Sequence, residues 1–360
     1  MTLRIGLLTS GGDCQALNAT MRGIVKTLIN KSSEPVEIYG FEDGYQGMIY
    51  RRYRKMDARD FSGILTRGGT ILGTSRTPFK RIDTPEADGV EKVPAMKQTY
   101  HDLNLDCLFM LGGNGSTKTA NRLSQEGLNV IALPKTIDND TWGTDMTFGF
   151  ASSVEVATRC IDEIHTTANS HGRVFVIEIM GHKVGWIPLY AGVAGGADVI
   201  LIPEIPYDMD NVCRVIEERD KAGSRFTIVV VAEGAISKEE AALSKKEYKK
   251  LVAARTTPSI AYDIAAEIDR RTGREIRVAI PGHTQRGGDP DAQDRIFATQ
   301  CGVEAGLACL KGKFGVMIAQ VNGKMTRVPL KEVAGKLKYV DPKSDLVREA
   351  RALGISFGDE

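Results

Sequence analysis

The sequence predicts an α/β protein in which mostly parallel β-sheets are covered by helices. Short runs rich in Val, Ile and Leu alternate with segments of helical period, which is the pattern of successive βαβ units. The predicted strands are apolar throughout, as strands that are buried on both faces should be. At 360 residues the chain is longer than one compact core usually grows, so we expect two lobes.

The elements can be placed along the chain by these two periods. The expected strands are 3–9, 36–41, 106–111, 129–133, 173–179, 198–202, 226–232, 275–280 and 315–321. The expected helices are 16–30, 88–104, 116–127, 150–169, 208–222, 257–272 and 291–310. We expect one lobe to contain residues 1–149 and 267–314, and the other to contain residues 150–266 and 315–360.

Composition excludes several functional classes. Charged residues make up 26% of the chain with a formal net charge of +1, so no global field recruits nucleic acid or an anionic membrane. The start MTLRIGLLTS does not resemble a signal peptide, and no apolar run approaches the ~18 residues that span a bilayer, so we expect a cytosolic protein. Six scattered cysteines without a C-x-x-C pair indicate reduced core thiols.

Glycines gather where predicted strands end. SGGD (10–13) and LGGNGS (111–116) follow the strands 3–9 and 106–111, where a following helix directs its free N–H groups at a ligand. Each pair of glycines taken alone can be only a tight turn. Together the two loops indicate phosphate binding, although the chain lacks both the P-loop motif and the G-x-G-x-x-G dinucleotide motif.

The segment LPKTIDND (133–140) adds carboxylates to this edge of the sheet. Asp138 and Asp140 are two residues apart, so in extended chain they project to the same side, where either can act as a general base or bind Mg²⁺. The alternative is an Asx-rich turn in water. Lys135 favours the first interpretation, because a cation beside carboxylates and glycine loops suits phosphoryl transfer.

Seven motifs in this order carry a resemblance to a known family. They are TSGGDCQALNA (9–19), GGTILGTSR (68–76), GGNGS (112–116), PKTIDND (134–140), MGH (180–182), AEG (232–234) and PGHTQRGG (281–288). The chain resembles the 6-phosphofructokinases over residues 1–310. The resemblance implies two Rossmann-like three-layer α/β lobes, the first binding the phosphoryl donor and the second the sugar phosphate, with the active site between them.

The resemblance also implies roles for single residues. Asp138 matches the base that deprotonates the C1 hydroxyl of fructose 6-phosphate, with Lys135, Thr136 and Asp140 beside it. Arg76 matches an arginine that touches the transferring phosphoryl group. The donor phosphates are expected against Gly12, Gly113, Asn114, Gly115 and Ser116. Mg²⁺ is expected at Asn114, Asp138 and Asp140.

Arginines and a histidine hold the sugar phosphate in that family, partly from a neighbouring subunit. The matching residues are Arg173, Arg277, His283 and Arg286, and the sugar itself is expected at Thr136, Asp138, Met180, Gly181, His182 and Glu233. Because the ligand crosses a subunit boundary, the resemblance implies a homodimer or homotetramer.

Two positions bear on the phosphoryl donor. Lys135 stands where the pyrophosphate-dependent branch has lysine, but that branch has an aspartate where this chain has Gly115. An aspartate there would crowd and repel the α-phosphate of a nucleotide, whereas glycine leaves room. The pair resembles a mixed-type subgroup, and we expect ATP as the donor, with pyrophosphate as the alternative.

Two further positions depart from the family pattern. Asn114 replaces an acidic residue that positions Mg²⁺, and His182 replaces an arginine that faces the transferring phosphate; we hypothesise that Lys135 offsets the second loss. A catalytically weak paralogue that binds sugar phosphate and regulates a partner is therefore an alternative of another class. The retained Asp138 and Glu233 favour the enzyme, a glycolytic Mg²⁺-dependent kinase that converts fructose 6-phosphate to fructose 1,6-bisphosphate.

Overall fold

The computed structural model describes residues 2–360, which form two compact units. The first unit contains the residues up to Ser152 together with Arg286–Lys338. The second contains Ser153–Gln285 together with Tyr339–Glu360. The chain therefore passes between the units three times, as expected for lobes without a simple linker.

The first unit is built on a seven-stranded sheet in the order β11-β10-β5-β4-β1-β2-β3. The strands are β1 (Leu3–Ser10), β2 (Val36–Phe41), β3 (Tyr53–Met56), β4 (Cys107–Gly112), β5 (Val130–Pro134), β10 (Val316–Val321) and β11 (Lys324–Pro329). The five inner strands pair in parallel, while β3 and β11 pair antiparallel at the two edges. The carboxyl ends of β5, β4 and β1 are consequently neighbours.

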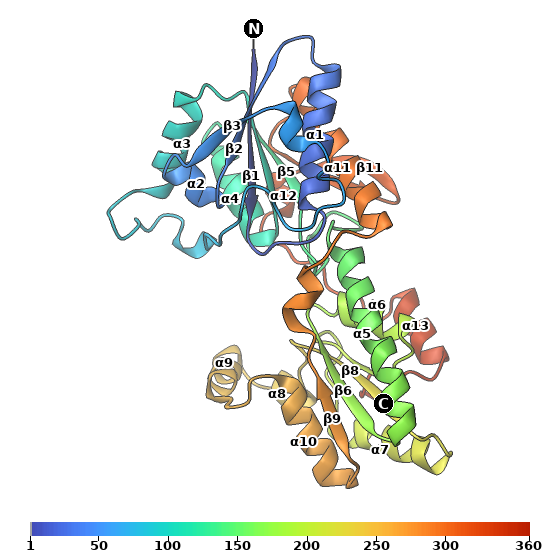
Figure 1. Ribbon diagram of the computed structural model, residues 1–360. Helices are drawn as coiled ribbons and strands as arrows, with labels where there is room; N and C mark the ends of the chain where they lie inside the picture. Colours follow the sequence, from blue (N-terminus) through green and yellow to red (C-terminus); the bar gives the residue numbers. More distant parts are fainter. Residues whose placement is uncertain (1) are drawn as a thin grey trace. The chain divides into compact units, whose positions relative to one another are not determined.

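Helices cover both faces of this sheet (Figure 1). They are α1 (Leu17–Lys31), α2 (Tyr45–Ile49), α3 (Lys92–Asp102), α4 (Asn114–Gln125), α11 (Ala292–Leu310) and α12 (Leu330–Val333). Leu108 and Met110 of β4 pack in a core with residues of α2, α3, α4 and α12. On the other side of the sheet, α1 and α11 pack closely against each other. A Cβ on Gly302 would come within 2.4 Å of the Thr20 carbonyl oxygen, so a glycine at this position permits the close packing.

The second unit has a four-stranded parallel sheet in the order β7-β8-β6-β9. Its strands are β6 (Val174–Ile179), β7 (Val199–Leu201), β8 (Thr227–Ala232) and β9 (Ile276–Ala279). The further helices are α5 (Phe150–His171), α6 (Trp186–Ala194), α7 (Met209–Lys221), α8 (Lys238–Ala241), α9 (Lys245–Ala254), α10 (Ile260–Thr272) and α13 (Asp345–Ala352). Val176 and Val229 pack in one core with apolar residues of α7 and α10.

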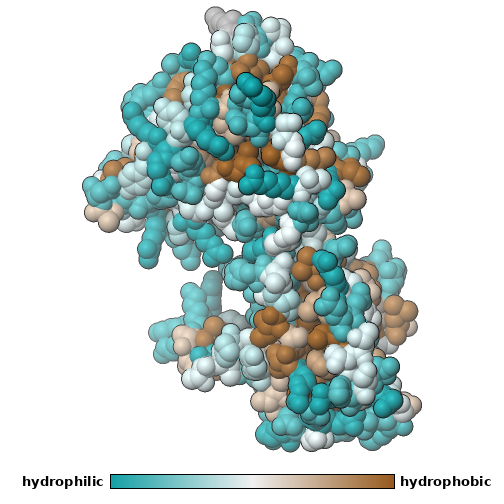
Figure 2. Space-filling model, viewed as in Figure 1, coloured by the Kyte–Doolittle hydropathy of each residue, from teal (hydrophilic) through white to brown (hydrophobic). Residues whose placement is uncertain are grey.

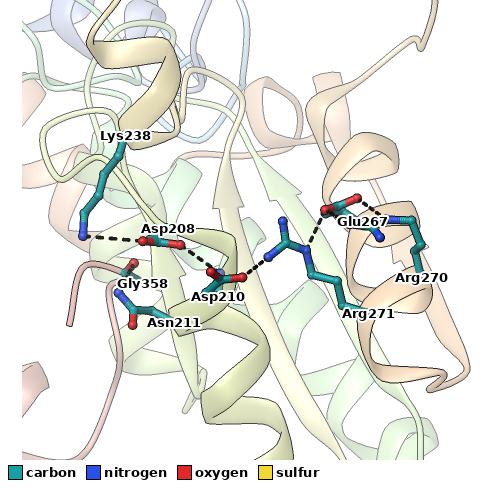
Figure 3. A network of polar contacts seen from close by, with 8 residues as sticks. All are labelled: Asp208, Asp210, Asn211, Lys238, Glu267, Arg270, Arg271 and Gly358. Atoms are coloured by element: carbon teal, nitrogen blue, oxygen red, sulfur yellow. Dashed lines mark hydrogen bonds and ion pairs between the residues drawn. The ribbon is translucent and has the colours of Figure 1, made fainter.

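Local chemistry sets where the helices of the second unit begin and end. The Ser259 hydroxyl accepts the Ala261 N–H at the start of α10, and Gly273 ends the helix with φ 66°. Figure 3 shows the charged network that joins α10 to the start of α7, in which Arg271 pairs with both Glu267 and Asp210. Exposed ion pairs contribute about 0–1 kcal/mol each, so apolar burial beneath them supplies most of the stabilisation.

The predicted fold class is confirmed, and the nine predicted strands all occur within one residue of their predicted ends. Two edge strands were missed, because β3 and β11 carry exposed or half-buried residues, several of them polar, instead of apolar runs. Helix α6 was missed because WIPLYAGVA is apolar on nearly every side and contains Pro188. The short helices α2, α8, α12 and α13 were also not predicted.

The unit boundaries differ from those expected from the sequence. The strand predicted at 315–321 belongs to the first unit, where β10 pairs with β5. The strand predicted at 275–280 belongs to the second unit, where β9 pairs with β6. The sheet to which a strand belongs depends on its pairing with segments far away in the sequence. A local apolar pattern does not indicate which strand is the partner.

In the part of the chain that the structure describes, no helix combines the length and the apolar character that a bilayer crossing requires. Figure 2 shows mainly hydrophilic side chains on the face in view, interrupted by smaller hydrophobic patches.

Candidate active site

Three loops meet at the carboxyl edge of the first sheet. They follow β1 (residues 11–13), β4 (113–116) and β5 (135–140), which are adjacent strands in the order β5-β4-β1. The Ser116 hydroxyl donates to the Ser10 hydroxyl at 2.9 Å, and the Lys135 N–H donates to the Gly112 carbonyl at 3.2 Å. Hydrogen bonds therefore hold each loop to its neighbour.

Two cationic side chains bind the glycine turn after β1. The Lys135 ammonium group donates to the Gly12 carbonyl, and the Arg286 guanidinium donates to the Asp13 carbonyl at 3.1 Å. A Cβ on Gly12 would lie 2.9 Å from Nη1 of Arg286, so glycine permits this close approach. The turn thus concentrates positive charge where the sequence predicts donor phosphates. Arg286, which was predicted to bind the sugar phosphate, therefore belongs to the first unit and contacts this turn.

Lys135 is nearly inaccessible, with 3% of its surface exposed. Burial is the main cause that lowers the pKa of Lys135, and the nearby charge of Arg286 lowers it further. Cys14 and Asp138 act in the opposite direction. Removing an ammonium group from water costs free energy that an anionic ligand can offset. The Lys135 environment therefore favours binding of a negatively charged group.

The loop after β5 holds two carboxylates close together. Asp138 is 9% exposed, and its N–H donates to the Thr136 hydroxyl at 3.1 Å. Asn139 has φ 53°, which turns the chain between Asp138 and Asp140. Burial raises the pKa of Asp140 to about 6, and the charge of Asp138 contributes to that shift. Such a desolvated pair fits a divalent cation, which would relieve the repulsion between the two groups.

The loop after β4 leads directly into α4. Gly113 is the N-cap residue and gives the helix no side-chain cap, so the first N–H groups of α4 remain suited to an anion. Gly115 is exposed, and a Cβ there would meet no atom within 4 Å. The Asn114 side-chain amide donates to the Lys336 carbonyl at 2.5 Å. Among residues 2–360, no group of three or more His, Cys, Asp or Glu side chains is arranged to hold a metal.

Arg76 lies on the segment next to the glycine turn that follows β1. Gly11 donates its N–H to the Ser75 carbonyl at 3.0 Å, and Ser10 forms a parallel bridge with Ser75. The side chain of Arg76 is exposed one residue further on. The backbone next to Arg76 is therefore fixed against the glycine turn.

In the second unit, Glu233 fixes the M-G-H turn that follows β6. Its Oε1 accepts the His182 N–H at 2.6 Å and the Gly181 N–H at 3.3 Å. His182 has φ 53° and an exposed side chain. Met180 donates its N–H to Gln285 Oε1 at 3.2 Å. The structure thus brings the predicted sugar-contacting residues of the second unit together at one end of its sheet.

The predicted phosphate-binding arginines of the second unit lie elsewhere. Arg173 precedes β6, and its Nε is 2.9 Å from Glu275 Oε2; Arg277 pairs with the same glutamate. Since β6 separates Arg173 from Met180 by six residues, the two lie roughly 20 Å apart along the strand. Within one chain, Arg173 and Arg277 therefore do not join Glu233. His283 is exposed on the 3₁₀ helix Gly282–Arg286.

The structure also reveals groups near these loops that no motif in the sequence indicates. Lys338 donates to Asn139 Oδ1 at 2.8 Å, and burial lowers its pKa to about 8. Asp294 is fully buried and accepts the N–H groups of Gly149 and Ser152, both at 2.9 Å. Lys338 lies in KLKY, which reads as an ordinary solvated segment.

Known proteins resemble this chain over most of its length. A family model described as phosphofructokinase matches residues 4–309. An ATP-dependent 6-phosphofructokinase of Spirochaeta thermophila is 52% identical over 99% of this chain and 98% of its own length. ATP-dependent 6-phosphofructokinase 3 of Bacteroides thetaiotaomicron is 46% identical over 99% and 100%.

Solved structures show the same fold. The T-state phosphofructokinase of Pichia pastoris superposes with a TM-score of 0.77 at 32% identity, covering 92% of this chain and 35% of that larger chain. A pyrophosphate-dependent phosphofructokinase of Nitrosospira multiformis reaches a TM-score of 0.80 over 99% of this chain and 92% of its own, but at 21% identity it supports the fold alone.

Proposed function

The chain belongs to the phosphofructokinase family, and from that premise we propose that it is an ATP-dependent 6-phosphofructokinase of glycolysis. The reaction transfers the γ-phosphoryl group of ATP to the C1 hydroxyl of fructose 6-phosphate, giving ADP and fructose 1,6-bisphosphate. The 6-phosphofructokinases of Spirochaeta thermophila and Bacteroides thetaiotaomicron carry ATP-dependence in their names. We place the reaction in the cytosol.

One observation carries this proposal: Lys135 and Arg286 converge on the turn at Gly12 and Asp13, beside the loop of the buried Asp138. Fixed cations at a backbone turn stabilise the charge of a transferring phosphoryl group. Buried in this setting, Asp138 can accept the C1 hydroxyl proton while that oxygen attacks the γ-phosphorus. The bond between the γ-phosphorus and the bridging oxygen then breaks, and ADP leaves.

Asp138 and Asp140 are the residues that would hold Mg²⁺, with the carbonyl oxygen of Asn114 as a weaker candidate. The raised pKa of Asp140 supports this assignment, because two carboxylates packed together without a cation repel each other. When bound, the ion neutralises charge on the donor phosphates. Arg76, Thr136 and the N–H groups of Gly113–Ser116 would complete the donor site.

The open space at Gly115 supports ATP as the donor. A side chain at this position would point into volume that no protein atom occupies within 4 Å. A nucleotide α-phosphate can use that volume, whereas an aspartate would fill it and repel the phosphate. Pyrophosphate lacks that third phosphate and gains nothing from the space.

The sugar phosphate is the ligand we assign to the second unit. Oε1 of Glu233 holds the M-G-H turn, and Oε2 can accept a hydrogen bond from a sugar hydroxyl. Arg173 and Arg277 lie at the opposite end of the sheet, so we infer that a second copy of the chain supplies them to the 6-phosphate, together with His283 of the first. The protein would then act as a homodimer or a homotetramer.

A coupled assay on purified protein tests the function. ADP-linked and fructose-bisphosphate-linked readouts are followed with ATP and then with pyrophosphate, in the presence of Mg²⁺ and after its removal by a chelator. We expect turnover with ATP and Mg²⁺ and at least about tenfold lower kcat/KM with pyrophosphate. Tight binding of fructose 6-phosphate without turnover on either donor would instead indicate the regulatory paralogue.

A further inference from the structure

We propose that Lys338 is a positioning residue that holds the loop of Asp138 and Asp140 in its productive conformation. This inference rests on the proposed phosphoryl transfer and adds to it a residue from the C-terminal part of the chain. Lys338 does not touch the reacting atoms in this scheme; it acts through the backbone of residues 139–145.

Lys338 makes four hydrogen bonds to that loop. Its ammonium group donates to Asn139 Oδ1 at 2.8 Å, to the Thr144 carbonyl at 3.0 Å and to the Asp145 carbonyl at 2.8 Å. Its own N–H donates to the Asp140 carbonyl at 2.9 Å. One residue therefore binds the loop at both ends of the segment 139–145.

Asn139 is the residue that most needs this support. It lies between the two carboxylates and adopts φ 53°, a left-handed conformation that costs free energy for a residue with a side chain. Its side-chain oxygen accepts from the half-buried Lys338. Loss of that donor would allow the peptide units on either side of Asn139 to relax, and Asp138 and Asp140 would move with them.

Residues next to Lys338 in the sequence also contact the loop after β4 (residues 113–116), where we expect the donor phosphates. Asn114 donates its side-chain amide to the Lys336 carbonyl at 2.5 Å, and Thr141 forms a bridge with Leu337. An acidic residue at position 114 has no proton to donate to that carbonyl. This contact gives a physical reason for Asn114 where the family usually has an acid: segment 336–338 fixes the loop after β4 as well as the loop after β5.

Positioning predicts a specific kinetic signature. A general base must lie within hydrogen-bond reach of its proton, and misplacement by about 1 Å can cost 10²-fold in rate. Lys338→Met removes the three hydrogen bonds while retaining a similar chain length. We expect kcat to fall by at least about tenfold, while the KM values for ATP and fructose 6-phosphate stay within about threefold, because the ligand-contacting groups remain.

The experiment compares wild-type protein, Lys338→Met and the matched control Lys331→Met, whose side chain is exposed on α12. Steady-state kinetics are combined with amide hydrogen exchange of peptides covering residues 136–148. We expect faster exchange of those peptides in Lys338→Met alone, with peptides from β1 and β4 unchanged. Should Lys338→Met fail to fold, Lys338→Gln, which retains an amide donor, is subjected to the same two measurements.

The two readouts separate this inference from the proposed function. If wild-type protein shows no phosphofructokinase turnover, the function is wrong, and hydrogen exchange still decides whether Lys338 holds the loop. Unchanged kcat in Lys338→Met, or unchanged exchange over 136–148, overturns the positioning role. A uniform loss of protection across the first unit also overturns it, since that result would assign Lys338 to general stability.

Discussion

The ammonium group of Lys135 donates a hydrogen bond to the backbone carbonyl of Gly12, which joins the loop after β5 to the glycine turn after β1. The sequence separation between the two residues is 123 positions. This contact places a buried cation beside the predicted base Asp138 and against the turn expected to hold the donor phosphates.

Lys135→Met should lower kcat by on the order of 10²-fold, because a fixed positive charge is lost where phosphoryl transfer develops negative charge. Methionine retains most of the buried volume, so packing changes little. Steady-state kinetics with ATP measure the effect, and Lys311→Met, an exposed lysine on the C-cap of α11, is the control. If Lys135 offsets the arginine that is absent at position 182, His182→Arg should restore part of the lost kcat.

Asp138→Asn should reduce kcat by about 10²–10⁴-fold with little change in either KM, because the amide fills the same space but cannot accept the hydroxyl proton. The buried position makes a solvent molecule a poor substitute. Asp289→Asn, at an exposed loop position, is the control. A kcat within threefold of wild type would remove Asp138 from the mechanism.

How much of this site the sequence could predict depends on the range of the interactions. The three loops were predictable, because apolar runs mark the ends of β1, β4 and β5 and glycines or carboxylates follow directly. The contacts that shape the site were not: Lys338 reaches Asn139 across 199 positions, and Glu233 binds His182 across 51. Local periods and motifs give no information about such pairs, so in the sequence the half-buried Lys338 resembles any solvated lysine.

Gly115→Asp should shift donor use away from ATP. The new side chain would occupy the open volume beside the start of α4 and would repel a nucleotide α-phosphate. We expect kcat/KM for ATP to fall by more than about tenfold, while the low activity with pyrophosphate falls less or rises. Gly115→Asn is the matched control, since it adds nearly the same volume without charge and separates crowding from repulsion. Equal losses with both donors in Gly115→Asp would contradict the steric and electrostatic account of donor choice.

Asp294→Asn should destabilise the first unit without altering substrate contacts. Asp294 is fully buried, and its two oxygens accept the N–H groups of Gly149 and Ser152 as well as the Ser152 hydroxyl. An asparagine offers one oxygen and presents an NH₂ group to the remaining donor. The free energy of unfolding should therefore fall by about 1–3 kcal/mol, as expected when a buried hydrogen-bonding group loses its partner.

The pH dependence of that loss tests the electrostatic part of the Asp294 environment. Burial raises the pKa of Asp294 above its ordinary value of 3.8, although the bonds from Ser152 act in the opposite direction. Below the unfolded-state pKa, Asp294 is protonated in both states, and the free energy of unfolding is not reduced by its ionisation. As pH rises through the folded-state pKa, the unfolded state loses its proton more readily than the folded state, so the free energy of unfolding declines. Denaturant unfolding at several pH values above 4 should thus show the difference between wild type and Asp294→Asn shrinking as pH increases. Asp269→Asn, at an exposed position on α10, should show neither effect, and a difference that grows with pH would reverse the assigned sign.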